Sequence, residues 1–532
     1  MKRRKFDMKQ MPGKLGNELD DRFKLAKPVR GLMTKVFPDH WSFLLGEIAL
    51  FSFIVLLLTG TFLALFFEPS MVEVHYDGSY IPLRGIEMSK AYESTLNISF
   101  DIRGGLVIRQ MHHWGALLFV AAILVHMGRV FFTGAFRKPR EANWVIGAIL
   151  FILAFFEGLF GYSIPDDGLS GTGLRIMSGI TESIPLVGSW ANAALFGGEY
   201  PGEVIVTRFY ILHVLLVPGI LLALIGVHVG LVFAQKHSQW PGPGRTEKNV
   251  VGFRMFPNYV SKQGGFFALV FAVIALMGGL FQINPIWMFG PYEASVVSSG
   301  SQPDFYVLFL EGLVRLFPAW ELRIGNAFMI PAVFWPAVIG MGVAFTVPIF
   351  YPFIERRFMK DRGHHNLLQR PRDNPTRTAV GVMVTSIFLI TTISGANDVI
   401  ADKFNISLNA MTWAGRIGIV VIPIAAYYLT HRICLGLQQH DREVLAHGIE
   451  TGILRRDAEG RFYEVHQPLS ELDEHGHPKP LEYNGWTVPK KMNRVGALAP
   501  AVKGFFKPIE QPTEPDESVE AGEPKKEIGA SK

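Results

Sequence analysis

Two histidines inside the apolar stretch 109–132 constrain the fold more than any other feature of this sequence. His112 and His126 are 14 residues apart, which is about 21 Å along an α-helix and four turns that return to nearly the same face. Arg109 precedes the first histidine by three residues, and Arg129 follows the second by three. An ionisable side chain inside a membrane span is costly and usually marks a functional site. The pattern therefore predicts a membrane-spanning helix with one site near each end.

A second apolar stretch, 208–234, carries His213 and His228, which are 15 residues apart. Fifteen residues are about 22.5 Å of helix, so the two stretches can place two histidine pairs at matched depths. Two axial imidazoles saturate a haem and suit it to electron transfer. A lone histidine on an apolar helix more often only hydrogen-bonds to a neighbouring helix. Two pairs at matched depths instead favour two haems, one above the other in the membrane.

Glycines repeat this spacing in the two flanking apolar stretches. Gly46 and Gly60 are 14 residues apart in the first, and Gly147 and Gly161 are 14 apart in the third. Glycine in a membrane helix lets another body approach the backbone closely. Helix–helix packing alone would explain either pair, but the match to the histidine spacing predicts that the glycines make room for flat porphyrins. A four-helix bundle around two haems follows.

The composition is typical of a membrane protein. Of the 532 residues, 49% are hydrophobic and only 18% are charged, which does not fit a single soluble core. Length and hydropathy predict an all-α integral membrane fold with about eight transmembrane helices, of which the first four form the dihaem bundle. The expected spans are 42–67, 106–133, 142–164, 206–234, 265–284, 328–353, 378–400 and 413–435.

The distribution of charge predicts the topology. Basic residues cluster in the KRRK run near the N-terminus and in segments 137–140, 236–254 and 355–377, whereas loops 68–101, 165–203 and 284–323 are acidic or neutral. Because basic loops favour the cytoplasmic side, we expect a multi-pass protein of the cell membrane with both termini in the cytoplasm. The first histidine of each stretch then lies near the outer face and the second near the inner face.

We expect five regions along the chain. They are a cytoplasmic N-terminal segment at 1–40, the dihaem bundle at 41–240, a second transmembrane part at 241–436, a cytoplasmic region at 437–500 and a disordered tail at 501–532. The fourth region contains GILRRDAEGRFYEVHQPL, which is predicted to form a small hairpin, and the tail is rich in Pro, Glu and Lys. Cys434 is the single cysteine, so this chain alone provides no disulfide, cysteine-ligated cluster or covalent haem motif. No cleavable signal is evident.

Several motifs resemble cytochrome b of the quinol:cytochrome c oxidoreductases, and the resemblance runs from His40 to Cys434. They are HWSFLLGEIALFSFIVLLLTG, IRQMHHWGALLFVAAILVHMGR, GYSIPDDGLSG, TRFYILHVLLVPG and FPAWEL. The 15-residue histidine spacing, the fused eight-span length, the long C-terminal tail and the motif HHNLLQRPRD look most like the actinobacterial type. That resemblance implies menaquinol as substrate and a Rieske iron–sulfur subunit as electron acceptor. It also implies a dihaem cytochrome c subunit, a haem–copper oxidase in a supercomplex and a homodimeric complex.

Carried over by position, the resemblance assigns the ligands of two b-type haems. His112 and His213 would ligate the low-potential haem near the outer face, and His126 and His228 the high-potential haem near the inner face. The two arginines that flank the first histidine pair match the family's partners of the haem propionates, for which a guanidinium is well suited. Snorkelling of both arginines to the membrane interface is the alternative explanation. His113 points away from the ligand face and is interpreted as second-shell or structural.

The quinol-oxidising pocket is expected outside the low-potential haem, between the loop 161–178 and the motif Pro318-Ala319-Trp320-Glu321. The family pattern is Pro-Glu-Trp-Tyr, so the usual carboxylate position holds alanine here. Quinol oxidation releases protons and needs a base within hydrogen-bond reach of the hydroxyl. We assign this role to Glu321, with Pro318 and Trp320 beside it, and Asp166 or Asp167 could share it.

The inner quinone site is less clear from sequence. The family uses a Lys-Asp pair before the fifth span, and this chain has Lys262-Gln263 instead. Lys236, His237 and Lys262 are the remaining proton donors, although basic residues at this edge more often only reflect the cytoplasmic side. The pair His364–His365 has no further ligands nearby, so a metal site there is not expected.

Two other function classes remain to be weighed. A dihaem anchor of a dehydrogenase or hydrogenase usually has four or five spans, and the additional spans and the PAWE loop argue against it. A transporter with proton-relaying histidines predicts internal repeats and broken helices, and the sequence has no recognisable repeat. We expect contacts with membrane lipid and none with nucleic acid.

Overall fold

The computed structural model describes residues 19–24, 26–198, 202–242, 244–296, 302–325, 328–469 and 474. These residues fold almost entirely into helices, joined by short two-stranded hairpins. The chain divides into two compact units, each described by itself: Met1–Arg370 with Val380–Tyr427, and Pro371–Ala379 with Tyr428–Lys532. The predicted tail at 501–532 lies outside the described residues.

Eight helices in the described part of the chain are long and apolar enough to cross a membrane, which confirms the predicted fold class and number of spans. They are α3 (Leu44–Ala64, entered through the turn Trp41–Phe43), α5 (Gly105–Phe132), α6 (Glu141–Ser163), α9 to α10 (Ile205–Gln235), α11 (Val260–Leu280, entered through Met255–Tyr259), α14 (Met341–Met359, entered through Trp335–Gly340), α15 (Pro375–Gly395) and α17 (Leu408–His447). The fifth and eighth extend beyond their predicted apolar cores, because a helix continues through polar turns that hydropathy does not register.

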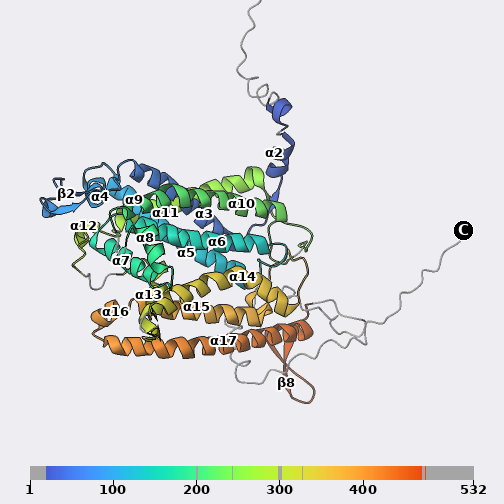
Figure 1. Cartoon of the computed structure of the whole chain (residues 1–532). Helices are drawn as coiled ribbons and strands as arrows, with labels where there is room; N and C mark the ends of the chain where they lie inside the picture. The colour runs from blue at the N-terminus through green and yellow to red at the C-terminus, as the bar shows by residue number, and fades with distance from the viewer. Residues whose placement is uncertain are drawn as a thin grey trace, which may run out of the picture. The chain divides into compact units, whose positions relative to one another are not determined.

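The first four spans share one apolar core and form a helix bundle. Phe53 of α3, Phe119 of α5, Phe155 of α6 and Leu221 of α10 are all buried in it. Figure 1 shows these helices side by side, coloured from blue to green. Aromatic rings contribute to the packing between these helices; the rings of Phe53 and Phe119, for example, are 5.5 Å apart between centroids. The bundle predicted from the histidine and glycine spacing is therefore present.

The fourth span contains one irregular turn. Between α9 (Ile205–Ile211) and α10 (Val217–Gln235), residues Leu212–Leu216 form a π-helical turn that includes His213. A π turn accommodates one extra residue without changing the direction in which the rest of the helix faces. The spacing of 15 residues between His213 and His228 is therefore equivalent to the 14-residue spacing on α5, and both histidine pairs face inward.

Shorter elements build the connections. On the predicted outer side they are β2 (Glu73–His75), η2 (Ile81–Leu83), β3 (Glu87–Ser89), α4 (Lys90–Phe100), α7 (Gly168–Glu182), α8 (Gly188–Phe196), α12 (Ile286–Phe289), α13 (Phe305–Leu316), β5 (Leu322–Ile324), β6 (Phe328–Ile330) and α16 (Asn397–Phe404). On the opposite side they are α2 (Ala26–Met33), β1 (Val36–Phe37) and β4 (Phe253–Arg254), and the second unit begins with η6 (Pro371–Asp373). Strands β7 (Ile449–Arg456) and β8 (Phe462–Gln467) pair antiparallel, which confirms the predicted C-terminal hairpin.

Candidate functional site

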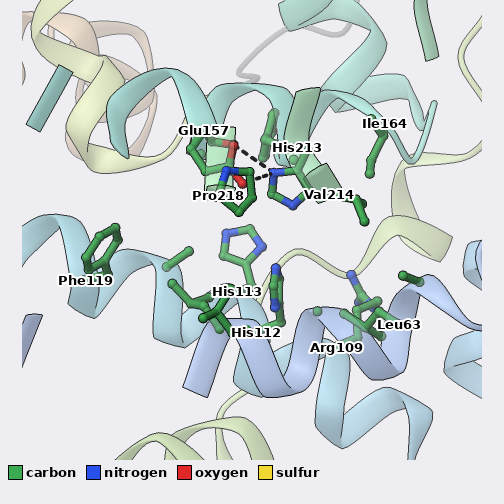
Figure 2. Close-up of a pocket in the computed structure, with 18 of the residues that line it drawn as sticks. Leu63, Arg109, His112, His113, Phe119, Glu157, Ile164, His213, Val214 and Pro218 are labelled. Carbon is green, nitrogen blue, oxygen red and sulfur yellow. Dashed lines mark hydrogen bonds and ion pairs between the residues drawn. The ribbon is translucent and has the colours of Figure 1, made fainter. Parts of the chain in front are cut away.

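The outer histidine pair is positioned to hold one metal ion. His112 of α5 and His213 of the π turn face each other with ring centroids 6.0 Å apart and planes at 84°. Figure 2 shows the two histidines reaching into one pocket from opposite sides. A metal bound about 2 Å from one nitrogen of each ring would place the ring centres about 6 Å apart. The observed spacing fits a bis-histidine metal centre.

The inner pair repeats this geometry. His126 of α5 and His228 of α10 have ring centroids 6.5 Å apart and planes at 76°. Because His112 and His126 lie on the same regular helix, the two pairs are separated by about 21 Å of helix rise. The four predicted ligands thus form two facing pairs at two depths of one bundle.

Hydrogen bonds fix the tautomers of the outer pair. The Thr59 hydroxyl donates its proton to the carbonyl of Val55 at 2.7 Å, so its oxygen accepts from Nδ1 of His112 at 2.9 Å. Nδ1 of His213 donates to Glu157, whose Oε1 lies at 2.9 Å and whose backbone carbonyl lies at 3.1 Å. With Nδ1 of both rings engaged as a donor, the lone pair resides on Nε2, as ligation requires.

Each of the four predicted glycines lies against one histidine ring. The pairs are Gly46 with His126, Gly60 with His112, Gly147 with His228, and Gly161 with His213. A Cβ atom on Gly161 would stand 2.3 Å from Cε1 of His213, whereas one on Gly147 would stand 3.4 Å from Cε1 of His228. The glycines accommodate the imidazole rings themselves, and the expectation that they also make room for porphyrin stays a prediction.

Two cavities adjoin the two pairs. The outer one, of about 250 Å³, is lined by residues of all four bundle helices, including both histidines and Arg109. Arg109 is buried; one guanidinium nitrogen donates to the carbonyl of Asn284 at 3.0 Å, and its Nε has no partner among the described residues. The inner cavity, of about 110 Å³, is lined by the inner histidines and Arg129.

Among the described residues, Arg129 has more guanidinium nitrogens without a hydrogen-bond acceptor than Arg109 has. Two of its guanidinium nitrogens, Nε and one terminal nitrogen, are buried without a hydrogen-bond partner among the described residues, and the group stacks 4.4 Å above the ring of Phe43. Buried polar groups are nearly always satisfied, and a carboxylate is the acceptor that a guanidinium binds best. Orphaned guanidinium nitrogens beside histidine pairs fit the carboxylates of haem, which supports the predicted role of both arginines.

The buried guanidinium of Arg140 joins three connecting segments on the inner side. Arg140 donates to the backbone carbonyls of His365 at 2.6 Å and Lys236 at 2.8 Å, and to Oδ1 of Asn366 at 2.7 Å. Burial lowers the pKa of Arg140 to about 10, and Glu247 opposes that shift. The side chain therefore stays charged and ties together the loops that close the inner cavity.

Asp166 lies at the mouth of the third span and is buried. It adopts a positive φ of 58°, and burial raises the pKa of its carboxyl to about 7 despite a hydrogen bond with Ser89. Neighbouring Asp167 is also buried but caps helix α7, accepting from the backbone N–H of Leu169 and from the hydroxyl of Ser170. Of the two predicted carboxylates, Asp166 is the one not committed to a helix cap.

The motif around Pro318 lies apart from the outer cavity. The Glu321 side chain is 42% exposed and pairs with Arg323 at 2.9 Å, and Trp320 is 66% exposed. None of the described residues that line the outer cavity belongs to this motif. The chain by itself therefore does not bring Glu321 and the outer histidine pair together.

Two polar residues of the outer cavity, Asp304 and Glu157, were not singled out from sequence. Nε2 of His113 donates to Oδ1 of Asp304 at 3.0 Å, and both line the cavity together with Glu157. A signal for Glu157 was available, because a carboxylate within an apolar span is rare enough to indicate a site. Asp304 gave no such signal, since its pairing depends on tertiary structure.

At the inner end the structure supplies a carboxylate beside Gln263. Gln263 stands at the position where the family pattern has a carboxylate and this chain has none. Glu47 of α3 accepts from the hydroxyl of Tyr259 at 2.5 Å and from the amide of Gln263 at 2.9 Å, and its second oxygen is buried without a partner among the described residues. The adjacent Lys262 pairs with Asp39 at the surface.

The other inner candidates have structural partners. Lys236 donates to the carbonyl of Lys248 at 3.0 Å. His237 is buried, and burial lowers the pKa of its imidazole to about 4, so it is neutral at physiological pH. His365 pairs with Asp361 at 2.9 Å, and within the described ranges no three metal-ligating side chains cluster.

Comparisons with known proteins bear on this site. Residues 117–291 match the family model described as cytochrome b(N-terminal)/b6/petB. The cytochrome b subunit of the cytochrome bc1 complex of Mycobacterium leprae is 57% identical over 501 residues, which are 94% of this chain and 91% of that protein. The corresponding subunit of Corynebacterium efficiens is 55% identical over 495 residues, 93% of this chain and 91% of its own length.

Similarity extends to a more distant actinobacterial relative and to a solved structure. The same subunit of Streptomyces coelicolor is 52% identical over 456 residues, covering 86% of this chain and 84% of that protein. A structure titled hyperthermophilic respiratory Complex III aligns with a TM-score of 0.56 at 21% identity, covering 77% of this chain and 99% of that one. The structural likeness concerns the fold, whereas the sequence relatives span nearly the whole chain.

Proposed function

The chain belongs to the cytochrome b subunits of the cytochrome bc1 complex, and on that premise we propose that it conducts electrons between two b-type haems across the membrane. As a member of this family it is a multi-pass membrane subunit of a quinol:cytochrome c reductase, respiratory complex III. Family membership sets aside both the transporter and the dehydrogenase anchor. The observation that carries the proposal is the stacking of two facing histidine pairs, at 6.0 and 6.5 Å, on α5 and the fourth span.

The protein's own groups divide the work of holding the haems. His112 and His213 would ligate the outer, low-potential haem, and His126 and His228 the inner, high-potential haem. The glycines leave room for the ligand rings, and Arg109 and Arg129 would bind the propionates. A bound haem supplies reversible one-electron chemistry, and two axial histidines leave no open position for oxygen. A charge moved between the pairs crosses about 21 Å of a hydrocarbon core about 30 Å thick.

Quinol oxidation is proposed at the outer cavity. Asp166 is not among the described lining residues but directly follows Pro165, which is, and its carboxyl has a pKa of about 7, which suits a proton acceptor near neutral pH. Glu321 remains the base proposed from its motif, beside Pro318 and Trp320; its exposed position fits a role in which a partner subunit covers it. Menaquinol is the proposed substrate. The proposed partners are a Rieske subunit, a dihaem cytochrome c and a haem–copper oxidase, within a homodimeric assembly.

Quinone reduction is proposed at the inner end, on the cytoplasmic side together with both termini. Glu47 would supply the carboxylate that Gln263 lacks, and the neighbouring pair Lys262–Asp39 lies at the surface. The hydrogen bonds from Tyr259 and Gln263 to Glu47 support this assignment. Protons would thus be released outside and taken up inside, which makes the electron transfer contribute to the proton gradient.

The test is a redox titration of the purified complex, followed by reduced-minus-oxidised spectra. Two b-type haems that titrate at separate potentials are expected. Replacing His213 or His228 by alanine should remove one haem each, the outer or the inner respectively. A wild-type complex that is folded but contains a single b haem, or none, would contradict the proposal.

A further inference from the structure

One ligand histidine differs from the other three in what its second nitrogen contacts. Glu157 lies one turn before Gly161 on α6, so its side chain faces the same ring that the glycine accommodates. Figure 2 shows the carboxylate of Glu157 beside His213, joined to it by dashed lines. Nδ1 of His213 donates to Oε1 at 2.9 Å and to the Glu157 carbonyl at 3.1 Å.

The other three histidines have neutral partners or none. Nδ1 of His112 donates to the hydroxyl oxygen of Thr59. For His126 and His228, Nδ1 has no hydrogen-bond partner in the described ranges, and the neighbouring backbone of Asn143 beside His228 is a neutral group. A carboxylate therefore acts on one ligand of the outer pair and, among described residues, on neither ligand of the inner pair.

The position of Glu157 is costly unless a positive centre compensates it. Its side chain is 15% exposed and lies within a membrane span, and its Oε2 is buried with no partner among the described residues. A carboxylate in such a place needs a nearby positive charge. Ferric iron in a porphyrin dianion carries one net positive charge and ferrous iron carries none, so the oxidised haem compensates Glu157 and the reduced haem does not.

We propose that Glu157 is a positioning residue that orients His213 and lowers the reduction potential of the outer haem below that of the inner one. The inference rests on the haem assignment proposed above. A carboxylate that accepts from a ligand imidazole raises the basicity of the ligating nitrogen, and hydrogen bonding around an axial ligand is one of the means by which a protein sets haem potential. Both effects favour the oxidised iron.

This asymmetry gives the electron path its direction. An electron that enters at the outer pair, where the oxidised state is stabilised, moves downhill to the inner pair, where no carboxylate opposes reduction. Thr59 and Glu157 each accept a hydrogen bond from Nδ1 of one outer histidine. The two ligands therefore differ mainly in the acceptor, which is a neutral hydroxyl for His112 and a carboxylate for His213.

The test compares Glu157→Gln with the wild-type complex by potentiometric titration of both haems. Glutamine keeps a hydrogen-bond acceptor at the same reach but removes the charge. We expect the ratio of reduced to oxidised outer haem at a fixed ambient potential to rise about tenfold, which is about 59 mV for a one-electron couple, while the inner haem is unchanged. The low-spin ferric resonance signal of the outer haem should shift as well.

Asp304→Asn is the matched control. Asp304 lines the same cavity and binds a histidine at 3.0 Å, but that histidine is His113, which is not a ligand. If the effect of Glu157 is transmitted through the ligand His213, Asp304→Asn should shift the reduction potential of the outer haem much less than Glu157→Gln does.

Three results would overturn the inference. They are an outer potential that is unchanged in Glu157→Gln, an equal shift in Asp304→Asn, and loss of the outer haem in Glu157→Gln, since a neutral acceptor should still hold the ring. A wild-type complex without two haems would instead contradict the proposed function, so the two failures can be told apart.

Discussion

Gly161 and His213 form the tightest of the four glycine–histidine contacts. A Cβ atom at Gly161 would stand 2.3 Å from Cε1 of His213 and 2.7 Å from its Nε2, so an alanine there must displace the ligand ring. Gly161→Ala is therefore expected to reduce haem occupancy of the outer site about 10- to 100-fold, the usual cost of a disturbed ligand environment. The measurement is the ratio of each haem to protein in the purified complex.

Gly128→Ala is the control for that substitution. Gly128 lies on α5 two residues after the ligand His126, and an added Cβ would meet nothing within 4 Å. Both haems should be retained. If Gly161→Ala kept a full outer haem with an unchanged spectrum, the ring contact would not matter for ligation.

Asp166 predicts a dependence on pH with a defined sign. Burial raises its pKa to about 7, above the ordinary value of about 4, so the folded protein binds this proton more tightly than the unfolded chain. The stability it contributes is complete below about pH 4 and is lost as the pH rises through about 7. Asp166→Asn should remove this loss, so its thermal unfolding midpoint should fall less than that of the wild type between about pH 5 and about pH 8.

The same ionisation governs the proposed function of Asp166. Only the ionised form accepts a proton, so quinol oxidation by the wild-type complex should accelerate as the pH rises through about 7, and Asp166→Asn should lose that step. A variant with the wild-type profile for both stability and rate would show that another group titrates.

At the scale of elements, the π turn Leu212–Leu216 makes a 15-residue spacing equivalent to 14. Leu215 in this turn is 68% exposed, so its removal disturbs no packing. Deleting Leu215 should convert the turn into regular helix and retain both haems, because His213 and His228 would then be spaced as on α5. Inserting one alanine beside Leu215 should remove one haem, since a single turn absorbs only one extra residue.

The spectra of the two length variants distinguish this account from its alternative. If the irregular turn were itself required for ligation, the deletion would abolish the outer haem and the insertion would be tolerated equally well or better.

The helix α3 contributes a carboxylate to the inner end, and this gives a further prediction. Glu47→Gln should slow oxidation of the inner haem by quinone about 100-fold, the usual contribution of a positioned acid–base group, with little change in quinol oxidation outside. Stopped-flow spectra of the inner haem measure this rate. Asp39→Asn is the control, because its exposed pair with Lys262 should contribute little; equal effects of the two substitutions would assign the role to surface charge instead.

The sequence predicted those features that helical periodicity determines locally. The ligand histidines and their glycines were found because 14 residues return to one face of a helix. Glu157 and Glu47 were missed as participants because their partners, His213 and Gln263, come from other helices. The π turn has no sequence signature of its own, and only the odd spacing of His213 and His228 hinted at it.

For the whole molecule, the two cavities lie at the two ends of one bundle, and the chain completes them at different points along its length. The described lining of the outer cavity ends at Tyr306. The inner cavity is closed by Arg140, whose guanidinium reaches His365 and Asn366. The described lining of the inner cavity ends earlier, at Ser238, but Arg140 finds its last acceptors only at His365 and Asn366.

The hydrogen bonds of Arg140 affect the order in which the chain folds during its synthesis. A nascent chain whose synthesis has passed the outer lining but has not reached Asn366 holds a buried arginine without two of its three acceptors, which is an unfavourable state for a guanidinium at a membrane edge. The loops that meet at Arg140 therefore acquire their full set of contacts only after Asn366 has been synthesised.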